Sequence, residues 1–193
     1  TTRGGGPGEM GDNLPAVDLG TGRTATSITT GVGHTCVRLD DNNVKCWGGG
    51  DVGQMGNAKT LNLGDEANEM GDNLPAVDLG TGRTATAIAA GRKHTCAILD
   101  DASVKCWGSN ASGQLGLGDT SNRGDGSGEM GDNLPAIELG TGRTATAIAA
   151  GHAHTCALLD NFSVKCWGNN ASGQLGLGDT IGRGDGVNEM GDN

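Results

Sequence analysis

Six cysteines, arranged in three pairs, are the residues of this sequence most suited to chemistry. The members of each pair are ten positions apart, and a histidine lies two positions before the first cysteine. The pairs are Cys36 with Cys46, Cys96 with Cys106, and Cys156 with Cys166. Two such thiols can form a disulfide, and two thiolates with a histidine are also ligands that zinc accepts. A catalytic cysteine needs one accessible thiolate beside a base, which three identical copies of a pair do not resemble.

The sequence around each pair is typical of a β-hairpin. In the middle copy we predict strands at His94–Leu99 and Ser103–Gly108, with a tight turn centred on Asp101. In this register Cys96 lies directly opposite Cys106, at a Cα separation of about 4.5–5.5 Å that suits a disulfide. We therefore predict a disulfide in each copy, stabilising by about 2–3 kcal/mol, and an oxidising, extracellular or cell-surface location. Zinc held by the histidine and both cysteines stays open as the alternative; otherwise the histidine is expected to bond a backbone carbonyl.

Each hairpin belongs to a repeat of 60 residues. The phrase Glu-Met-Gly-Asp-Asn begins at Glu9, Glu69, Glu129 and Glu189, and residues 69–128 differ from residues 129–188 at only 12 positions. We divide the chain into the tail of a preceding repeat (1–8), three full repeats (9–68, 69–128 and 129–188) and the start of a fourth (189–193). The pattern is cut at both ends, so we expect further repeats, or neighbouring molecules, to complete the array.

Four short strands are predicted in each repeat. Besides the hairpin, Asn73–Leu79 is predicted as an edge strand because Pro75 lacks an N–H for a central ladder, and Ala85–Ala90 as an inner strand of small residues. Helices are not expected, since no apolar period of 3.6 residues occurs and glycine, 38 residues in all, interrupts every candidate. The fold class is therefore all-β, built from tandem four-stranded antiparallel units.

The third repeat carries the most recognisable motifs. His-Thr-Cys-Ala-Leu-Leu-Asp (154–160), Ser-Val-Lys-Cys-Trp-Gly (163–168) and Ser-Gly-Gln-Leu-Gly-Leu-Gly-Asp-Thr (172–180) resemble the RCC1 (regulator of chromosome condensation) repeat, in its cysteine-bearing bacterial-type branch. The resemblance covers all three repeats and implies a β-propeller with one four-stranded blade per repeat, usually seven. Three repeats would then form a partial or open propeller, or one completed by other chains. The matched residues are structural, so the guanine nucleotide exchange and chromatin binding of eukaryotic members are not carried over.

Composition excludes several function classes. The chain has 23 acidic and 13 basic residues, a net charge of −10, which argues against nucleic acid as a partner. No apolar run is long enough for membrane insertion. No nucleophile with a matching base can be found, so we do not expect an enzyme, and no cofactor is implied.

Three further motifs are weaker candidates. Asp119, Asp125, Glu129 and Asp132 lie on a Gly-rich stretch and could hold a structural Ca²⁺, although ordinary solvated turns explain them as well. Asn110, Asn161 and Asn170 have the form of glycosylation acceptors and are expected to be exposed in turns. Two Arg-Gly-Asp tripeptides, at 123–125 and 183–185, are products of the repeat rather than adhesion signals.

Positions that vary between repeats are the best guide to binding. They include Val32-Gly33, Arg92-Lys93 and His152-Ala153, each just before a cysteine-bearing strand, and the hairpin turns at Asn42-Asn43, Ala102 and Phe162. A constant framework with varied loops is how repeat proteins present binding surfaces, although neutral drift produces the same pattern. Two functions follow: an extracellular scaffold that associates with itself head to tail into a filament, or a closed propeller that binds a protein or glycan through its variable loops.

Overall fold

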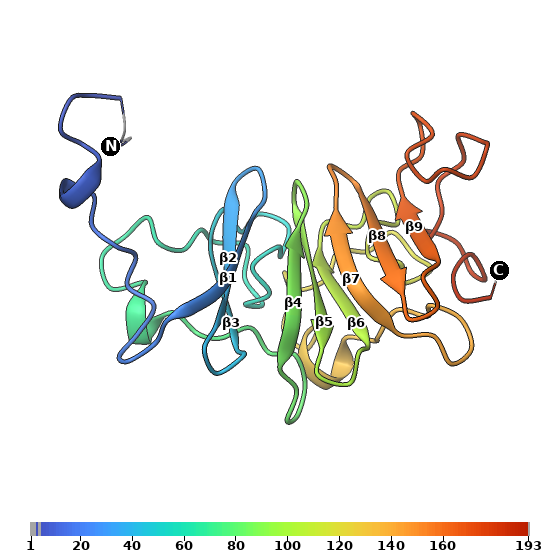
Figure 1. Cartoon of the computed structure of the whole chain (residues 1–193), viewed down its shortest axis with the longest axis horizontal. Coiled ribbons are helices and arrows are strands. Elements are labelled where there is room, and N and C mark those ends of the chain that lie inside the picture. Colours follow the sequence, from blue (N-terminus) through green and yellow to red (C-terminus); the bar gives the residue numbers. More distant parts are fainter. Residues whose placement is uncertain (1–2, 4, 193) are drawn as a thin grey trace.

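The computed structural model describes residue 3 and residues 5–192, which form three antiparallel sheets of three strands each. The sheets follow one another along the chain and stand side by side (Figure 1). They comprise β1 (Ala25–Thr30), β2 (His34–Leu39) and β3 (Val44–Gly48); β4 (Ala85–Ala90), β5 (His94–Leu99) and β6 (Val104–Gly108); and β7 (Ala145–Ala150), β8 (His154–Leu159) and β9 (Val164–Gly168). A short 3-10 helix precedes each sheet: η1 (Gly11–Asn13), η2 (Gly71–Asn73) and η3 (Gly131–Asn133).

The register of the cysteine hairpin is the one that the sequence predicts. Cys96 lies opposite Cys106, with Thr95 opposite Trp107 on the other face of the sheet. The first and third repeats have the same pairing. Because side chains alternate between faces, this register directs corresponding residues of all three sheets to the same face.

The predicted fourth strand is not present among the described residues. Residues 74–79 run extended without a ladder, and their main-chain link to a sheet is the Val77 N–H, which donates to Val44 O at 2.8 Å. Ile137 N–H donates in the same way to Val104 O at 2.8 Å. This segment therefore lies along the outer strand of the preceding repeat. Pro75 explains the lost ladder, since a residue without an N–H cannot donate to a neighbouring strand.

The hydrophobic core lies between sheets rather than within one repeat. The first cluster joins Cys36 and Met55 of repeat 1 to Leu99 and Trp107 of repeat 2, and a second, equivalent cluster joins repeats 2 and 3. Each sheet is too small and too poor in aromatic residues to form a core alone. Adjacent repeats therefore stabilise one another, as in other repeat architectures.

The inner strands β1, β4 and β7 adjoin one another, which explains their small side chains. The turn after β4 is the tightest point. A Cβ placed on Gly91 would lie 2.1 Å from the His94 ring and 2.4 Å from Gly151 O. Only glycine fits here, because any side chain would collide with both the histidine and the next repeat.

Across residues 3 and 5–192, none of the helices has the length and apolar character that crossing a bilayer requires.

Candidate binding face

The three turns that join the first and second strands of each sheet meet on one face of the molecule. They carry the variable pairs Val32-Gly33, Arg92-Lys93 and His152-Ala153. Main-chain bonds link them, since Val32 N–H donates to Arg92 O and Arg92 N–H donates to His152 O, each at 3.3 Å. In Figure 1 these turns lie along the upper edge of the three sheets. Hence residues that are 60 positions apart in sequence form one continuous surface, which we call the turn face.

A polar cavity of about 430 Å³ opens on the turn face between the second and third repeats. Its lining comprises Arg92, Lys93, Ser109, Ala111, Ser112, Gln114, His152, Ala153, Asn169 and Gln174. These ten residues fall on six positions of the repeat, and three of the six differ between repeats 2 and 3, compared with 12 of all 60 positions. Half of the positions that line the cavity therefore vary, against a fifth of the positions in the whole repeat.

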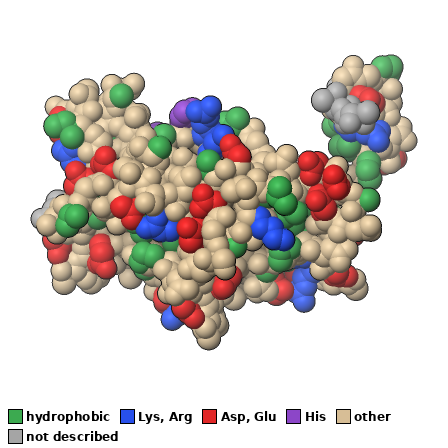
Figure 2. Space-filling model, turned by 180° about the vertical axis from the view of Figure 1, so that it is seen from behind, with side chains coloured by type: hydrophobic (Ala, Val, Ile, Leu, Met, Phe, Trp, Pro, Cys, Tyr) green, Lys and Arg blue, Asp and Glu red, His purple; other side chains and the backbone are tan. Residues whose placement is uncertain are grey.

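The lining of this cavity is basic, although the protein as a whole is acidic. The cavity lining includes Arg92, Lys93 and His152 and contains no aspartate or glutamate. Lys93 pairs with Asp51 of the preceding repeat, whereas Arg92 has no side-chain partner among the described residues. Figure 2 shows Lys or Arg side chains beside a histidine at the upper edge of the molecule. This charge contrasts with the net charge of −10 of the whole chain.

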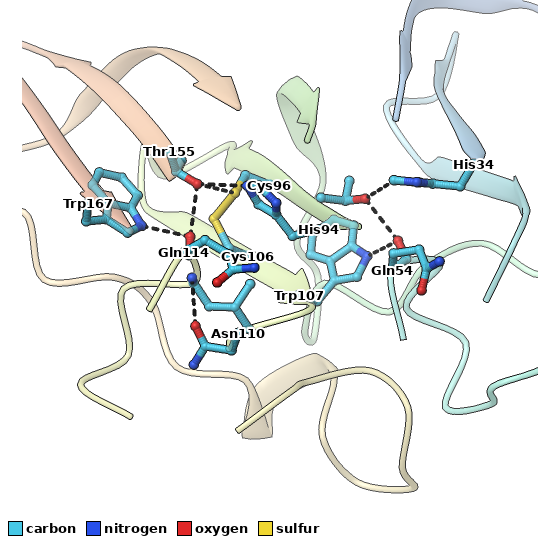
Figure 3. The surroundings of a disulfide bond; sticks show 12 residues. His34, Gln54, His94, Cys96, Cys106, Trp107, Asn110, Gln114, Thr155 and Trp167 are labelled. Atoms are coloured by element: carbon cyan, nitrogen blue, oxygen red, sulfur yellow. Dashed lines mark hydrogen bonds between the residues drawn. A yellow bond between two sulfur atoms is a disulfide. The ribbon is translucent and has the colours of Figure 1, made fainter. Parts of the chain in front are cut away.

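A chain of buried hydrogen bonds joins adjacent repeats beneath the turn face (Figure 3). His34 Nε2 bonds Thr95 Oγ1 at 2.9 Å, and Thr95 Oγ1 donates to Gln54 O at 2.9 Å. Trp107 Nε1 donates to the same oxygen at 3.1 Å. The next junction repeats the pattern with His94, Thr155, Gln114 and Trp167. The histidine thus contacts a hydroxyl of the next repeat, so the expected bond to a backbone carbonyl was wrong.

This chain determines which histidine nitrogen carries the proton. Thr95 donates its single hydroxyl proton to Gln54, so it must accept from His34 Nε2–H. The Nδ1 atoms of His34 and His94 are buried without a partner. Burial lowers the pKa of each ring to about 4, assisted for His94 by the nearby His34 and His154. Both histidines are therefore neutral structural connectors at physiological pH.

The cysteines form the three predicted disulfides. Cys36–Cys46 and Cys96–Cys106 have Cα atoms 4.1 Å apart, and Cys156–Cys166 has them 4.0 Å apart. No free cysteine occurs in the described part of the chain, and no group of three or more metal-ligating side chains forms there. The zinc alternative is therefore wrong for this structure, because zinc binds thiolates and not a disulfide.

The calcium candidates do not converge within the described residues. Asp119 pairs with Arg123, Glu129 accepts the N–H groups of Gly124 and Gly126, and Asp132 accepts from Thr81 of the preceding repeat. Asp125 does not join the other three candidates in a group that could hold a metal ion. Three of the four carboxylates thus have separate partners within the protein, and binding of Ca²⁺ stays a prediction that chelation can test.

Two of the three glycosylation candidates are buried, contrary to expectation. Asn110 and Asn170 are at most 1% exposed, and the Nδ2 of each donates to the carbonyl of Asp119 or Asp179. Their side chains close the Gly-rich loops from inside, which the sequon pattern alone does not reveal. Asn161 is exposed in a hairpin turn, and its modification stays a prediction. The arginines of both Arg-Gly-Asp tripeptides are tied to aspartates of their own loops.

The two end repeats expose side chains that the junctions bury. Ile28 is 67% exposed on the first sheet, whereas its counterpart Ile88 packs against the core. Val164 is 63% exposed on the third sheet, whereas Val44 and Val104 are fully buried. The large exposed apolar residues of the described chain all belong to repeats 1 and 3. Each end thus presents half of the interface that joins adjacent repeats.

Comparisons with known proteins identify the repeat. A family model described as Regulator of chromosome condensation (RCC1) repeat matches residues 25–54, 85–114 and 145–174, and a second model of that description matches residues 101–158. The ultraviolet-B receptor UVR8 of Arabidopsis thaliana is 33% identical over 88% of this chain, which spans 34% of that protein. A Caenorhabditis elegans homolog of the X-linked retinitis pigmentosa GTPase regulator is 30% identical over 88% of this chain and 11% of its own length.

Solved structures share the fold. Yeast RCC1 (Prp20), crystallised with Kap60, superposes with a TM-score of 0.60 at 19% identity, covering 86% of this chain and 36% of that one. Human WBSCR16 gives 0.62 at 20% identity, covering 83% of this chain and 38% of that one. The chain therefore corresponds to little more than a third of these folds.

Proposed function

This chain belongs to the Regulator of chromosome condensation (RCC1) repeat family, and from that premise we propose that it is a protein-binding module whose partner docks on the turn face. The observation that carries the proposal is that half of the positions lining the cavity between repeats 2 and 3 vary, against a fifth of all positions in the repeat. The framework below is constant, and the disulfides and the His–Thr chains hold it rigid. Varied residues on a rigid frame suit specific recognition.

Other proteins with this fold have protein partners, which supports a protein as the partner of this chain. Yeast RCC1 was crystallised with Kap60, and Prp20p from Saccharomyces cerevisiae has been described with binding properties to Gsp1p and histones. We do not extend guanine nucleotide exchange or histone binding to this chain, since its net charge of −10 opposes association with chromatin. We favour a protein over a glycan because no Trp, Tyr or Phe ring lines the cavity for a sugar to stack on. Three disulfides support an extracellular or cell-surface location.

Site-specific photo-crosslinking tests the docking face. A photoreactive amino acid at Ala111, which is exposed beside the cavity, should capture one defined protein from the native surroundings of this chain. The same group at the exposed hairpin residue Phe162, away from the turn face, is the matched control and should capture none of it. The purified partner should then bind the unmodified chain. Capture through Phe162 instead of Ala111 would show that the turn face is not the docking surface.

A second proposed function is assembly through the two ends, and a separate observation supports it. Ile28 at one end and Val164 at the other are exposed counterparts of residues that pack into or against the core at both internal junctions. We propose that further repeats, of the same chain or of another copy, cover these faces, and that copies can join head to tail. Light scattering should show a mass that rises with concentration and falls to the monomer in Val164→Lys, and electron microscopy should distinguish fibres from closed rings. A monomer at all concentrations would contradict assembly.

A further inference from the structure

We infer that the cavity between repeats 2 and 3 binds a compact anionic group, namely a carboxylate of the docked partner protein. The inference rests on the proposed docking face and names the chemistry by which one part of that face would recognise its partner.

Several hydrogen-bond donors of the cavity lining have no acceptor among the described residues. The amide oxygen of Gln114 accepts Ser112 N–H at 2.9 Å, and that of Gln174 accepts Ser172 N–H at 2.8 Å. The Asn169 oxygen accepts Gln174 Nε2 at 2.9 Å. With the amide oxygens engaged by the protein itself, the Asn169 amino group and the Ser112 hydroxyl are left to face a ligand, and the Ser109 hydroxyl, which accepts Gln114 Nε2 at 3.3 Å, keeps its own proton to donate. A ligand that satisfies them must supply acceptors.

Charge in the cavity favours the same type of ligand. Arg92 is exposed and has no side-chain partner among the described residues, and His152 of the next repeat lines the cavity beside it, its carbonyl accepting Arg92 N–H at 3.3 Å. No carboxylate competes for these groups within the lining. A guanidinium binds a carboxylate through two parallel N–H···O bonds, which gives both affinity and orientation.

The junction between repeats 1 and 2 provides an internal comparison. There Val32 and Gly33 replace Arg92 and Lys93, and Asp51 replaces Ala111. Asp51 accepts an ion pair from Lys93, so an acidic side chain of the chain itself occupies the position that a ligand would take. At that junction Arg92 and Lys93 take the places of His152 and Ala153, so the two junctions share one backbone frame but only the first contains a carboxylate that pairs with the cations.

The whole-chain charge limits the size of the anion. A net charge of −10 repels nucleic acids and other polyanions, so local attraction by one arginine and its neighbours suits a single carboxylate. An aspartate or glutamate side chain, or a terminal carboxylate of the partner, meets this condition.

The test uses the full chain, labelled with ¹⁵N, and acetate as the probe. Titration at constant ionic strength should give saturable shifts of the amides of Ala111, Ser112 and Ala153. Arg92→Val and Ala111→Asp copy the residues of repeat 1, so both should fold, and each should weaken acetate binding at least ten-fold. Lys59→Ala removes an exposed cation elsewhere and should leave binding unchanged.

Three outcomes would overturn the inference. They are the absence of saturable shifts, equal binding by Arg92→Val, and phosphate binding far more tightly than acetate, which would assign the cavity to a phosphorylated ligand. Crosslinking from Ala111 separates the two proposals. If the partner is still captured by the Arg92→Val chain with unchanged affinity, the docking face stands and the carboxylate site fails. If Ala111 captures nothing while acetate still binds, the docking proposal fails and the anion site stands.

Discussion

Acidification from pH 7.5 to pH 5.0 should loosen the junctions between repeats, because two buried histidines must stay neutral there. His34 is 3% exposed and His94 is fully buried, and the Nδ1 of each has no acceptor for a second proton. Burial lowers the pKa of both rings to about 4, against 6.5 in the unfolded chain. Between these values the unfolded chain binds protons that the folded chain cannot, so stability is full above pH 6.5 and falls as the pH drops towards 4.

The size of the effect follows from the two pKa values. At pH 5.0 each unfolded histidine is almost fully protonated while each folded one is mostly neutral, which costs about 2 kcal/mol per histidine and about 4 kcal/mol in all. With a urea m-value of about 2–3 kcal/mol/M, the unfolding midpoint should fall by about 1.3–2 M. Carboxylates contribute little in this window, because their pKa values lie below it.

Urea unfolding followed by tryptophan fluorescence at pH 7.5, 6.5, 5.5 and 5.0 measures this loss. Trp107 and Trp167 are fully buried at the two junctions and donate to the same oxygens as the histidine-bonded threonines, so their emission reports these contacts directly. His152→Gln, which removes the exposed histidine, is the matched control and should keep the full pH dependence. The double change His34→Gln and His94→Gln should flatten it.

An unfolding midpoint that is equal at pH 7.5 and 5.0 would refute the reasoning, because the rings would then accept a proton without cost. An undiminished pH dependence in the double variant would also refute it, since another group would be responsible.

Three further predictions follow from the repeats. Replacing Cys96 and Cys106 by alanine should cost about 2–3 kcal/mol of stability in urea unfolding, and the same change at the less buried Cys156 and Cys166 should cost less; an equal or larger loss there would contradict the packing argument. Phe162 has a φ of 68°, where repeat 1 has Asn42 at 64°, so Phe162→Asn should raise stability by about 0.5–1 kcal/mol and Asn42→Phe should lower it, as thermal unfolding can check. Chelation by EDTA should leave the melting temperature unchanged because the acidic loops are closed by protein hydrogen bonds, whereas a clear drop would restore the calcium hypothesis.

Lys45 and Lys105 illustrate contacts that no local pattern reveals. Each ammonium group is largely buried and donates to two main-chain carbonyls, those of Leu19 and Gly71 for Lys45 and those of Leu79 and Gly131 for Lys105. In sequence these lysines look like ordinary surface residues of a strand. In the structure they fasten the 3-10 helix of the following repeat to the sheet before it.

The sequence by itself determined the repeat, the three cysteine hairpins, their register and the small residues of the inner strand. These features depend on residues that are close together in the chain. Side chains alternate between the two faces of a strand and the turn is short, so only one register buries the apolar side chains of the hairpin. Pro75 correctly predicted that its segment lies outside a central ladder. It did not predict that this segment would bond to the preceding repeat through a single main-chain hydrogen bond.

Only the tertiary structure decided how the repeats meet. The His34–Thr95 bond joins residues 61 positions apart, and the Thr95–Gln54 bond joins residues 41 apart. Such contacts depend on the angle and distance between sheets, which no local period encodes. The same packing brought Arg92 and His152 to one cavity. The chain specifies each hairpin locally, whereas the binding face exists only because adjacent sheets bury their apolar sides against each other and so bring distant turns together.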